Sequence, residues 1–120
     1  DTAVLSMPLV RAGKIKALAT TGRERMAAAP TIPTLIETGV PGYEVVVWFG
    51  LFTTAKTPSE IVAKLNAETV AFFGAAAVRD QLASDGIQIA TGTPEMLAAF
   101  LKSEIVKWGT MVRDAGVRAE

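Results

Sequence analysis

The chain has 120 residues, of which 50% are hydrophobic and 20% are charged, and its 12 basic and 12 acidic residues give a net charge of zero. These values predict one globular domain with its own core, and the scattered basic residues exclude an electrostatic surface for nucleic acid. The chain has neither cysteine nor histidine, which excludes thiolate nucleophiles, disulfides, imidazole bases and the usual zinc ligands.

The first half of the chain is expected to contain a strand and a turn before a second strand. The segment KIKALATTG, residues 14–22, alternates apolar residues on one side and ends at its glycine. Pro30 and Pro33 prevent a continuous helix in the segment that follows. A short helical turn is expected over residues 34–38, with Gly39 ending it.

The second expected strand covers residues 43–54 and is long and apolar. From Val45 to Phe52 it carries no charge, and its one non-apolar position is Gly50. A strand with one solvated face alternates apolar and polar residues, so this run predicts a strand that is buried on both faces.

Three helices and a short strand are expected in the second half. Residues 57–60 (TPSE) have the pattern of a capping box with proline at the first helical position, and apolar residues then repeat at helical spacing. A second helix over residues 76–84 stops at an Asp-Gly pair, and a strand follows over residues 87–90. The third helix begins at residues 93–95 (TPE) and ends at Gly116. This order of strands and helices indicates an α/β sandwich.

The polar residues of the helices give weak indications of catalysis. Ser103 and Lys107 lie four residues apart, where a Ser-Lys nucleophile pair could meet, but two solvated residues on an amphipathic helix are the simpler interpretation. Glu60 and Glu95 lie at helix starts, where carboxylates cap amides and complement the helix dipole. The sequence therefore predicts no enzymatic activity, no cofactor and no metal site.

Three segments have residues that could contact a ligand. Residues 19–23 (ATTGR) follow a predicted strand at its carboxyl end, where open α/β sheets bind ligands, although a plain turn is the simpler interpretation. Residues 91–95 (TGTPE) offer the same donors, but helix capping explains them without a ligand. Trp48 is expected in the core, and the alternative is that its indole forms the floor of a pocket beside Gly50.

Four segments together resemble one family, the periplasmic solute-binding proteins of tripartite tricarboxylate transporters, also called Bug or TctC proteins. They occur in the family's order, at residues 11–25 (RAGKIKALATTGRER), 30–52 (PTIPTLIETGVPGYEVVVWFGLF), 56–68 (KTPSEIVAKLNAE) and 92–120 (GTPEMLAAFLKSEIVKWGTMVRDAGVRAE). The resemblance covers nearly the whole chain and contains no catalytic signature.

The resemblance implies an α/β fold that is part of a two-lobed, type II periplasmic-binding-protein-like architecture. Residues 1–42 would then end the second lobe, and residues 43–54 would cross between the lobes as a long strand or hinge. Residues 55–120 would form the C-terminal helical part of the first lobe. The sequence would therefore be the C-terminal portion of a longer protein.

The resemblance also implies a function in the periplasm, namely capture of a small carboxylate, such as a di- or tricarboxylate, for delivery to the membrane subunits of a transporter. The family's two Gly-rich loops, whose amides take the solute's carboxylate, have no counterpart here. Asp1 corresponds to the family's Asp that ends an "FD" motif and faces the cleft. Thr21 and Trp48 are further ligand-binding candidates because of their positions.

The alternative function is structural: a self-associating α/β fragment that binds no small molecule. Sheets that lack partner strands expose edges and apolar faces, and these surfaces favour pairing between chains. A homodimer is therefore expected for the isolated chain.

Overall fold

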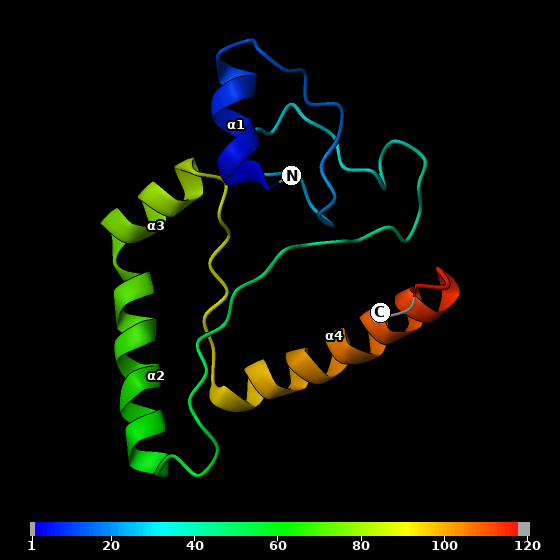
Figure 1. Ribbon diagram of the computed structural model, residues 1–120. Helices are drawn as coiled ribbons and strands as arrows, with labels where there is room; N and C mark the ends of the chain where they lie inside the picture. The colour runs from blue at the N-terminus through cyan, green and yellow to red at the C-terminus, as the bar shows by residue number, and fades with distance from the viewer. Residues whose placement is uncertain (1, 118–120) are drawn as a thin grey trace. The chain divides into compact units, whose positions relative to one another are not determined.

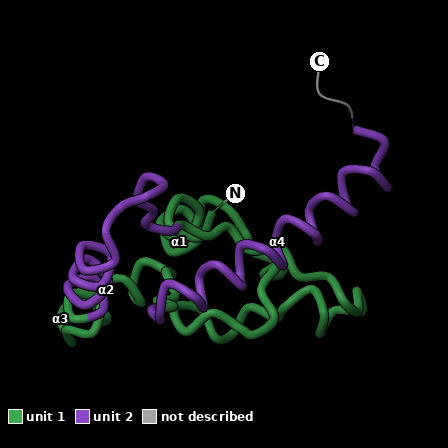
Figure 2. The backbone as a smooth tube through the Cα atoms, turned by 90° about the horizontal axis from the view of Figure 1, so that it is seen from below, with its two compact units in different colours: residues 1–49, 71–90 green, residues 50–70, 91–120 purple. Residues whose placement is uncertain are grey.

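The computed structural model describes residues 2–117, whose regular elements are helices (Figure 1). These are α1 (Ala3–Arg11), α2 (Ser59–Gly74), α3 (Ala76–Ser84) and α4 (Pro94–Asp114). The chain divides into two compact units, shown in separate colours in Figure 2. Unit 1 contains the chain up to Phe49 and Ala71–Ala90, whereas unit 2 contains Gly50–Val70 and the chain from Thr91 onward.

The structure contains the three helices expected in the second half. They could be predicted because the residues that start and stop them are near neighbours in the sequence. Helix α4 begins as predicted: the Thr93 hydroxyl accepts the Met96 N–H at 3.3 Å, and Pro94 is the first helical residue. Its end is followed by Gly116, whose φ of 66° is the left-handed conformation that a glycine permits. Helix α3 ends at Asp85, and Gly86 follows it with a φ of 80°.

Removing the hydroxyl that caps α4 should destabilise the chain. We expect Thr93→Ala to lower the free energy of unfolding by about 1 kcal/mol, because one amide of the first turn loses its acceptor. Chemical denaturation followed by circular dichroism measures this change. Thr110→Ala is the control, since Thr110 lies inside the same helix and caps no end. An equal loss in both variants would contradict the capping role.

The predicted capping box before α2 is wrong in one respect. The Thr57 hydroxyl donates to the Thr54 carbonyl at 2.8 Å and so belongs to the preceding turn, where Lys56 has a φ of 70°. The Pro58 carbonyl accepts the first amide bonds of the helix. Among the described residues the Thr57 hydroxyl bonds only within this turn and accepts no amide of α2, which the sequence pattern did not reveal.

Helices α2 and α3 meet at a sharp bend of 69°. In the part of the chain that the structure describes, no single helix is both long and apolar enough to cross a membrane, and this bent pair meets the criteria of length and composition when its helices are combined.

Helix α1 was not expected from the sequence. It contains Pro8, which lacks an amide donor, and its Thr2 side chain makes no capping bond. The helix ends through a bond from the Lys14 N–H to the Leu9 carbonyl at 2.9 Å, with Gly13 at a φ of 67°. Burial supports it, because Met7 is 6% exposed within the small core of unit 1.

That core gathers residues from α1 and from the turn-rich segment that follows it. Its buried members are Met7, Ala29 and Ile32, and Ala3, Ala17 and Met26 pack against them. Because these side chains are small or flexible, α1 and the segment around residue 30 can approach closely. The core therefore holds the loops of unit 1 in place without a sheet.

The strands expected at residues 14–22 and 87–90 form no ladder in the described chain. The β pairing within residues 2–117 is one parallel bridge between Thr20 and Thr34. The expected helical turn over residues 34–38 is a hydrogen-bonded turn that ends at Gly39, with a φ of 99°. A strand requires partners from elsewhere in a sheet, and local alternation cannot supply them.

The long crossing strand is likewise not confirmed. Residues 46–53 run without helix or ladder (Figure 1), and the burial predicted for both faces is wrong for this chain. Phe49 is 93% exposed, and Val47 and Leu51 are more than 60% exposed. Burial of both faces needs neighbouring strands and covering layers, and the described residues supply neither. The division at residues 1–42, 43–54 and 55–120 stays a prediction.

Candidate functional site

The loop at residues 19–23, here called the threonine loop, is held by backbone hydrogen bonds on two sides. The Thr20 N–H donates to the Pro33 carbonyl, and the Leu35 N–H donates to the Thr20 carbonyl, both at 2.8 Å. The Thr21 carbonyl accepts the Val45 N–H at 3.0 Å. These bonds fix the loop between the turn at residues 33–35 and the start of the apolar segment.

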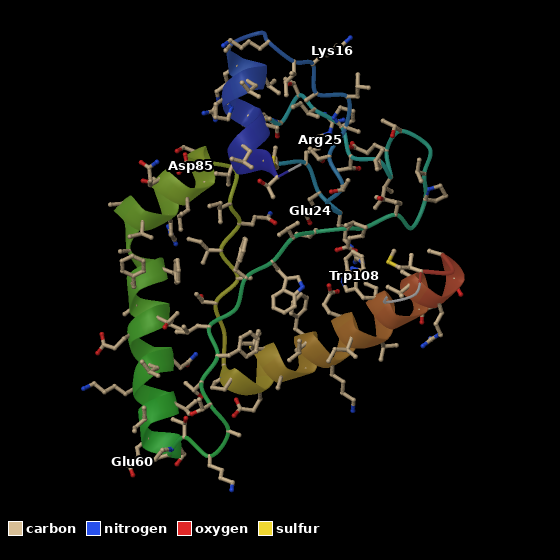
Figure 3. The ribbon with its side chains drawn as sticks, in the orientation of Figure 1. Lys16, Glu24, Arg25, Glu60, Asp85 and Trp108 are labelled. Carbon is tan, nitrogen blue, oxygen red and sulfur yellow. The ribbon has the colours of Figure 1, made fainter. Side chains whose placement is uncertain are left out.

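A second set of bonds fixes that turn. The Thr34 N–H donates to the Glu37 carboxylate at 2.7 Å, and the Glu37 N–H donates to the Thr34 hydroxyl at 3.2 Å. Arg25 holds the same carboxylate, with its Nε 3.0 Å from both oxygens and its Nη2 2.9 Å from one of them. Thr34, Glu37 and Arg25 are called the Glu37 cluster below, and Figure 3 labels Arg25.

The Glu37 cluster has strong electrostatic consequences for its charged members. The hydrogen bond from Arg25, followed by that from the Thr34 N–H, lowers the pKa of Glu37 to about 2. The hydrogen bond and charge of Glu37 raise the pKa of Arg25 in return. Both groups therefore remain charged over the whole physiological range, and the turn keeps its ion pair.

A small hollow of about 300 Å³ lies beside the threonine loop. Arg23 spans part of its wall and donates to one oxygen of Glu44 from Nε at 3.3 Å and from Nη2 at 3.2 Å. Its side chain is 77% exposed, so this ion pair contributes little stability. The lining residues are Gly22, Arg23, Glu24, Glu44, Val46 and Gln88. With two carboxylates and one guanidinium, the wall carries no excess of positive charge.

The structure places two of the three predicted ligand-binding residues. Thr21 is exposed, and its hydroxyl makes no hydrogen bond within the described residues. Trp48 is partly buried and lies three residues after the Val45 amide that binds the Thr21 carbonyl. Both lie in unit 1, and neither lines the 300 Å³ hollow. Asp1 lies outside the described residues.

The polar residues of α4 are not arranged for nucleophilic catalysis. The Ser103 hydroxyl donates to the Phe100 carbonyl at 2.7 Å, whereas the Lys107 ammonium pairs with Glu104 at 3.1 Å. Glu104 is 8% exposed and also accepts the indole N–H of Trp108, which Figure 3 labels. Lys107 is thus engaged with Glu104 and does not activate Ser103. In residues 2–117 no group of acidic side chains is arranged to hold a metal ion.

The ion pairs of Arg23 and Arg25 were not expected from the sequence. One of them had a visible signal, because Thr34 and Glu37 have the S/T-x-x-E spacing of a capping box. This spacing was not interpreted as a capping box, because Pro30 and Pro33 exclude a long helix there and a capping box usually precedes one. The Arg23–Glu44 pair joins residues that are 21 positions apart, and no local pattern predicts it.

Two threonines of this site should respond oppositely to the same substitution. Thr34 is 1% exposed and its hydroxyl accepts a hydrogen bond, so Thr34→Val should lower the free energy of unfolding by about 1 kcal/mol. The Thr20 hydroxyl is buried without a partner among the described residues, so Thr20→Val should be neutral or stabilising by up to about 1 kcal/mol. Urea denaturation of both variants checks this. A larger loss for Thr20→Val than for Thr34→Val would refute the assignment.

Solved structures share this fold at substantial sequence identity. Rpa4515 of Rhodopseudomonas palustris, solved with adipate, is 35% identical with a TM-score of 0.87 over 97% of this chain and 39% of its own. The periplasmic binding protein BugD is 29% identical with a TM-score of 0.86, over 96% of this chain and 39% of its own. MatC of R. palustris, solved with bound malate, is 37% identical with a TM-score of 0.78, over 93% of this chain and 39% of its own. The described chain therefore has the fold of part of a periplasmic binding protein.

The family follows from sequence comparison. The profile of the tripartite tricarboxylate transporter family receptors, TctC, matches residues 1–117, and the chain belongs to this family. A UPF0065 protein from the tcbD-tcbE intergenic region of Pseudomonas sp. strain P51 is 38% identical over 104 residues, 86% of this chain and 31% of the relative. BugT of Bordetella pertussis is 28% identical over 109 residues, 91% of this chain and 33% of the relative.

These comparisons confirm the resemblance found in the sequence, and they define its extent. The family consists of substrate-binding receptors and not of enzymes. The chain spans about a third of the length of these curated relatives and 39% of each of the three solved chains. The architecture that surrounds this segment in the relatives is therefore larger than the segment itself.

Proposed function

We propose that the chain forms part of a periplasmic receptor that captures small organic carboxylates for a tripartite tricarboxylate transporter. The observation that carries this proposal is the match to Rpa4515, which covers 97% of the chain at a TM-score of 0.87 and whose structure holds adipate. The relative MatC, solved with malate, supports the same ligand class. The membrane subunits of the transporter would be the partners that receive the solute.

Within this receptor, the threonine loop would form one wall of the solute site. The exposed Thr21 hydroxyl can donate to a carboxylate, and Trp48 offers an indole ring for the solute's carbon chain. Asp1 is proposed as a third contact. Affinity would come from hydroxyl and amide donors, because Arg23 and Arg25 are already paired with carboxylates. Residues 43–54 would link the two lobes of the receptor.

Calorimetric titration tests this proposal. The chain is titrated with adipate and malate, and with adipamide as an uncharged match for adipate. We expect heat from the carboxylates alone, and a loss of affinity of about tenfold in Thr21→Val, equivalent to one hydrogen bond to a charged group. Thr53→Val is the control, because this threonine lies outside the threonine loop. Absence of binding to both acids would reject the proposal for this chain.

The second candidate is self-association, and the exposed apolar segment favours it. Residues 46–53 are predominantly apolar and join no strand ladder within the described chain, which is the arrangement that promotes pairing between chains. A homodimer is the simplest closed assembly of this kind. Sedimentation at micromolar concentration distinguishes it from a monomer.

A further inference from the structure

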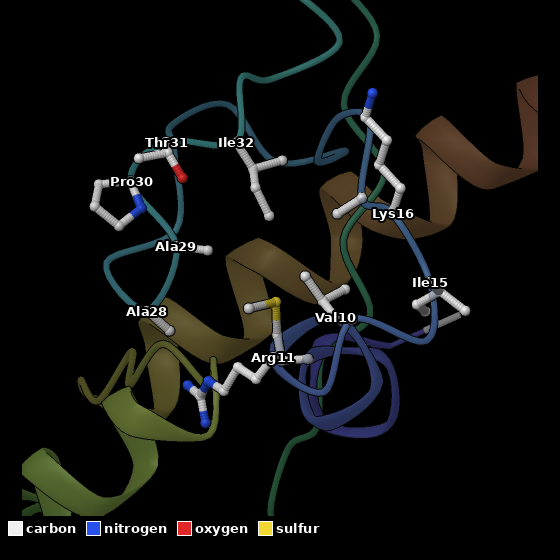
Figure 4. A pocket seen from close by; sticks show the side chains of 12 residues that line it. Val10, Arg11, Ile15, Lys16, Ala28, Ala29, Pro30, Thr31 and Ile32 are labelled. Carbon is white, nitrogen blue, oxygen red and sulfur yellow. The ribbon is translucent and has the colours of Figure 1, made fainter.

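A larger hollow of about 600 Å³ lies in unit 1, apart from the threonine loop (Figure 4). Three parts of the chain form its walls: the end of α1, the segment after Gly13, and the turn at residues 28–32. Its volume falls within the range of small-molecule sites, about 300–1,000 Å³. Thr21 and Trp48, the residues proposed above to contact the solute, do not line it.

The floor of this hollow is apolar and buried. Met7, Ala29 and Ile32 line it, and these are the buried apolar residues that form the core of unit 1. Val10 and Ile15 extend the apolar wall on the α1 side, as Figure 4 shows. An apolar body placed here would contact side chains that the fold already holds.

The rim of the hollow carries positive charge without a counterpart. Arg11 and Lys16 are its charged residues, and the lining contains no carboxylate. Arg11 donates from Nη2 to the Ser84 carbonyl at 2.8 Å, which anchors its guanidinium but leaves its charge unneutralised. Neither residue makes an ion pair within the described residues.

Arg11 and Lys16 differ in this respect from two other arginines of unit 1. Arg23 and Arg25 each pair with a glutamate, and neither lines this hollow, although Arg25 also donates to the carbonyl of the lining residue Pro30 at 3.0 Å. Unpaired cations beside an apolar floor form an environment that attracts an anion with an apolar body. A monocarboxylate with an apolar body suits both features, since a second carboxylate lying over Met7 and Ile32 would find no polar partner there.

We propose that this hollow binds an amphipathic organic monocarboxylate, with the carboxylate at Lys16 and the apolar body over Met7 and Ile32. The apolar body would be an alkyl chain of medium length or a single aromatic ring. This site is independent of the solute site proposed for the receptor, since it involves different residues and a different class of acid.

The test uses octanoate and its uncharged match, octanamide, with the whole chain labelled at its methionine and isoleucine methyl groups. We expect octanoate to shift the methyl signals of Met7 and Ile32 and to bind about tenfold more tightly than octanamide. Lys16→Gln should weaken octanoate about two- to fivefold, as for the loss of an exposed ion pair. Adding adipate should not displace octanoate.

Lys14→Gln provides the matched control, because Lys14 is an exposed lysine two residues away that does not line the hollow. It should leave the affinity for octanoate unchanged. Three results would each overturn the proposal: no shift at the Met7 and Ile32 methyl groups, equal affinity for octanoate and octanamide, or equal effects of the two lysine substitutions. Lys16 is exposed, so its replacement leaves the core of unit 1 intact.

Discussion

Replacing Phe49 with lysine is expected to dissociate the homodimer proposed above into monomers. Phe49 is 93% exposed at the centre of the apolar segment at residues 46–53, so it is the side chain that gains most from being covered. Burying one phenylalanine contributes about 1.5–3 kcal/mol, and a two-fold interface buries it twice. The dissociation constant of the dimer should therefore rise by about a hundredfold to ten-thousandfold.

Sedimentation velocity across a micromolar concentration series measures this change. Ile105→Lys is the matched control, because Ile105 is 64% exposed on α4 and lies outside the apolar segment. We expect this variant to keep the proposed dimer. If Phe49→Lys remains dimeric, the segment is not the interface, and if both variants become monomeric, the effect is not specific to the segment.

The helices could be predicted from sequence to the extent that their signals are local. Thr93, Pro94 and Gly116 mark the ends of α4 through bonds and dihedral angles that involve near neighbours, and each behaves as expected. Helix α1 was missed because it lacks such signals and contains Pro8. The helix is stabilised by burial of Met7 against Ala29 and Ile32, which lie more than 20 positions later in the sequence.

The strands could not be predicted, because a strand is defined by its partners. The run from Val45 to Phe52 is apolar on both faces, so the pattern indicates that both faces favour burial. It does not identify the neighbouring strands that would bury them. In the described chain the ladder is reduced to the bridge between Thr20 and Thr34. Sequence did identify the family correctly, since that inference used four segments together and not the pairing of any one.

The candidate site was anticipated in part. The threonine loop was chosen for its position after an expected strand, and the structure gives it backbone bonds on two sides. The roles of Asp1, Thr21 and Trp48 in binding stay predictions. The residues that hold the neighbouring turn, Arg25 and Glu37, were missed because their ion pair forms across a loop whose path the sequence does not specify.

Arg25→Gln is expected to raise the pKa of Glu37 from about 2 toward its ordinary value of 4.5, because it removes the largest cause of the depression. The Thr34 N–H would still hold the carboxylate, so part of the depression should remain. A carboxyl group with a depressed pKa stabilises the folded state fully above its unfolded pKa and loses that contribution as the pH falls through its folded pKa. For Glu37 the loss should therefore occur between about pH 4.5 and pH 2.

Nuclear magnetic resonance of the Glu37 side-chain carboxyl carbon follows this titration directly, and hydrogen exchange at the Thr34 amide reports whether the turn opens as the carboxylate is protonated. Arg23→Gln is the control, since Arg23 lies in the same loop but pairs with Glu44. In Arg23→Gln the pKa of Glu37 should equal that in the parent chain. A Glu37 midpoint that stays near pH 2 in Arg25→Gln would show that the Thr34 amide alone depresses the pKa. Equal shifts in both arginine variants would show that the general positive charge of the loop, and not the bond from Arg25, controls Glu37.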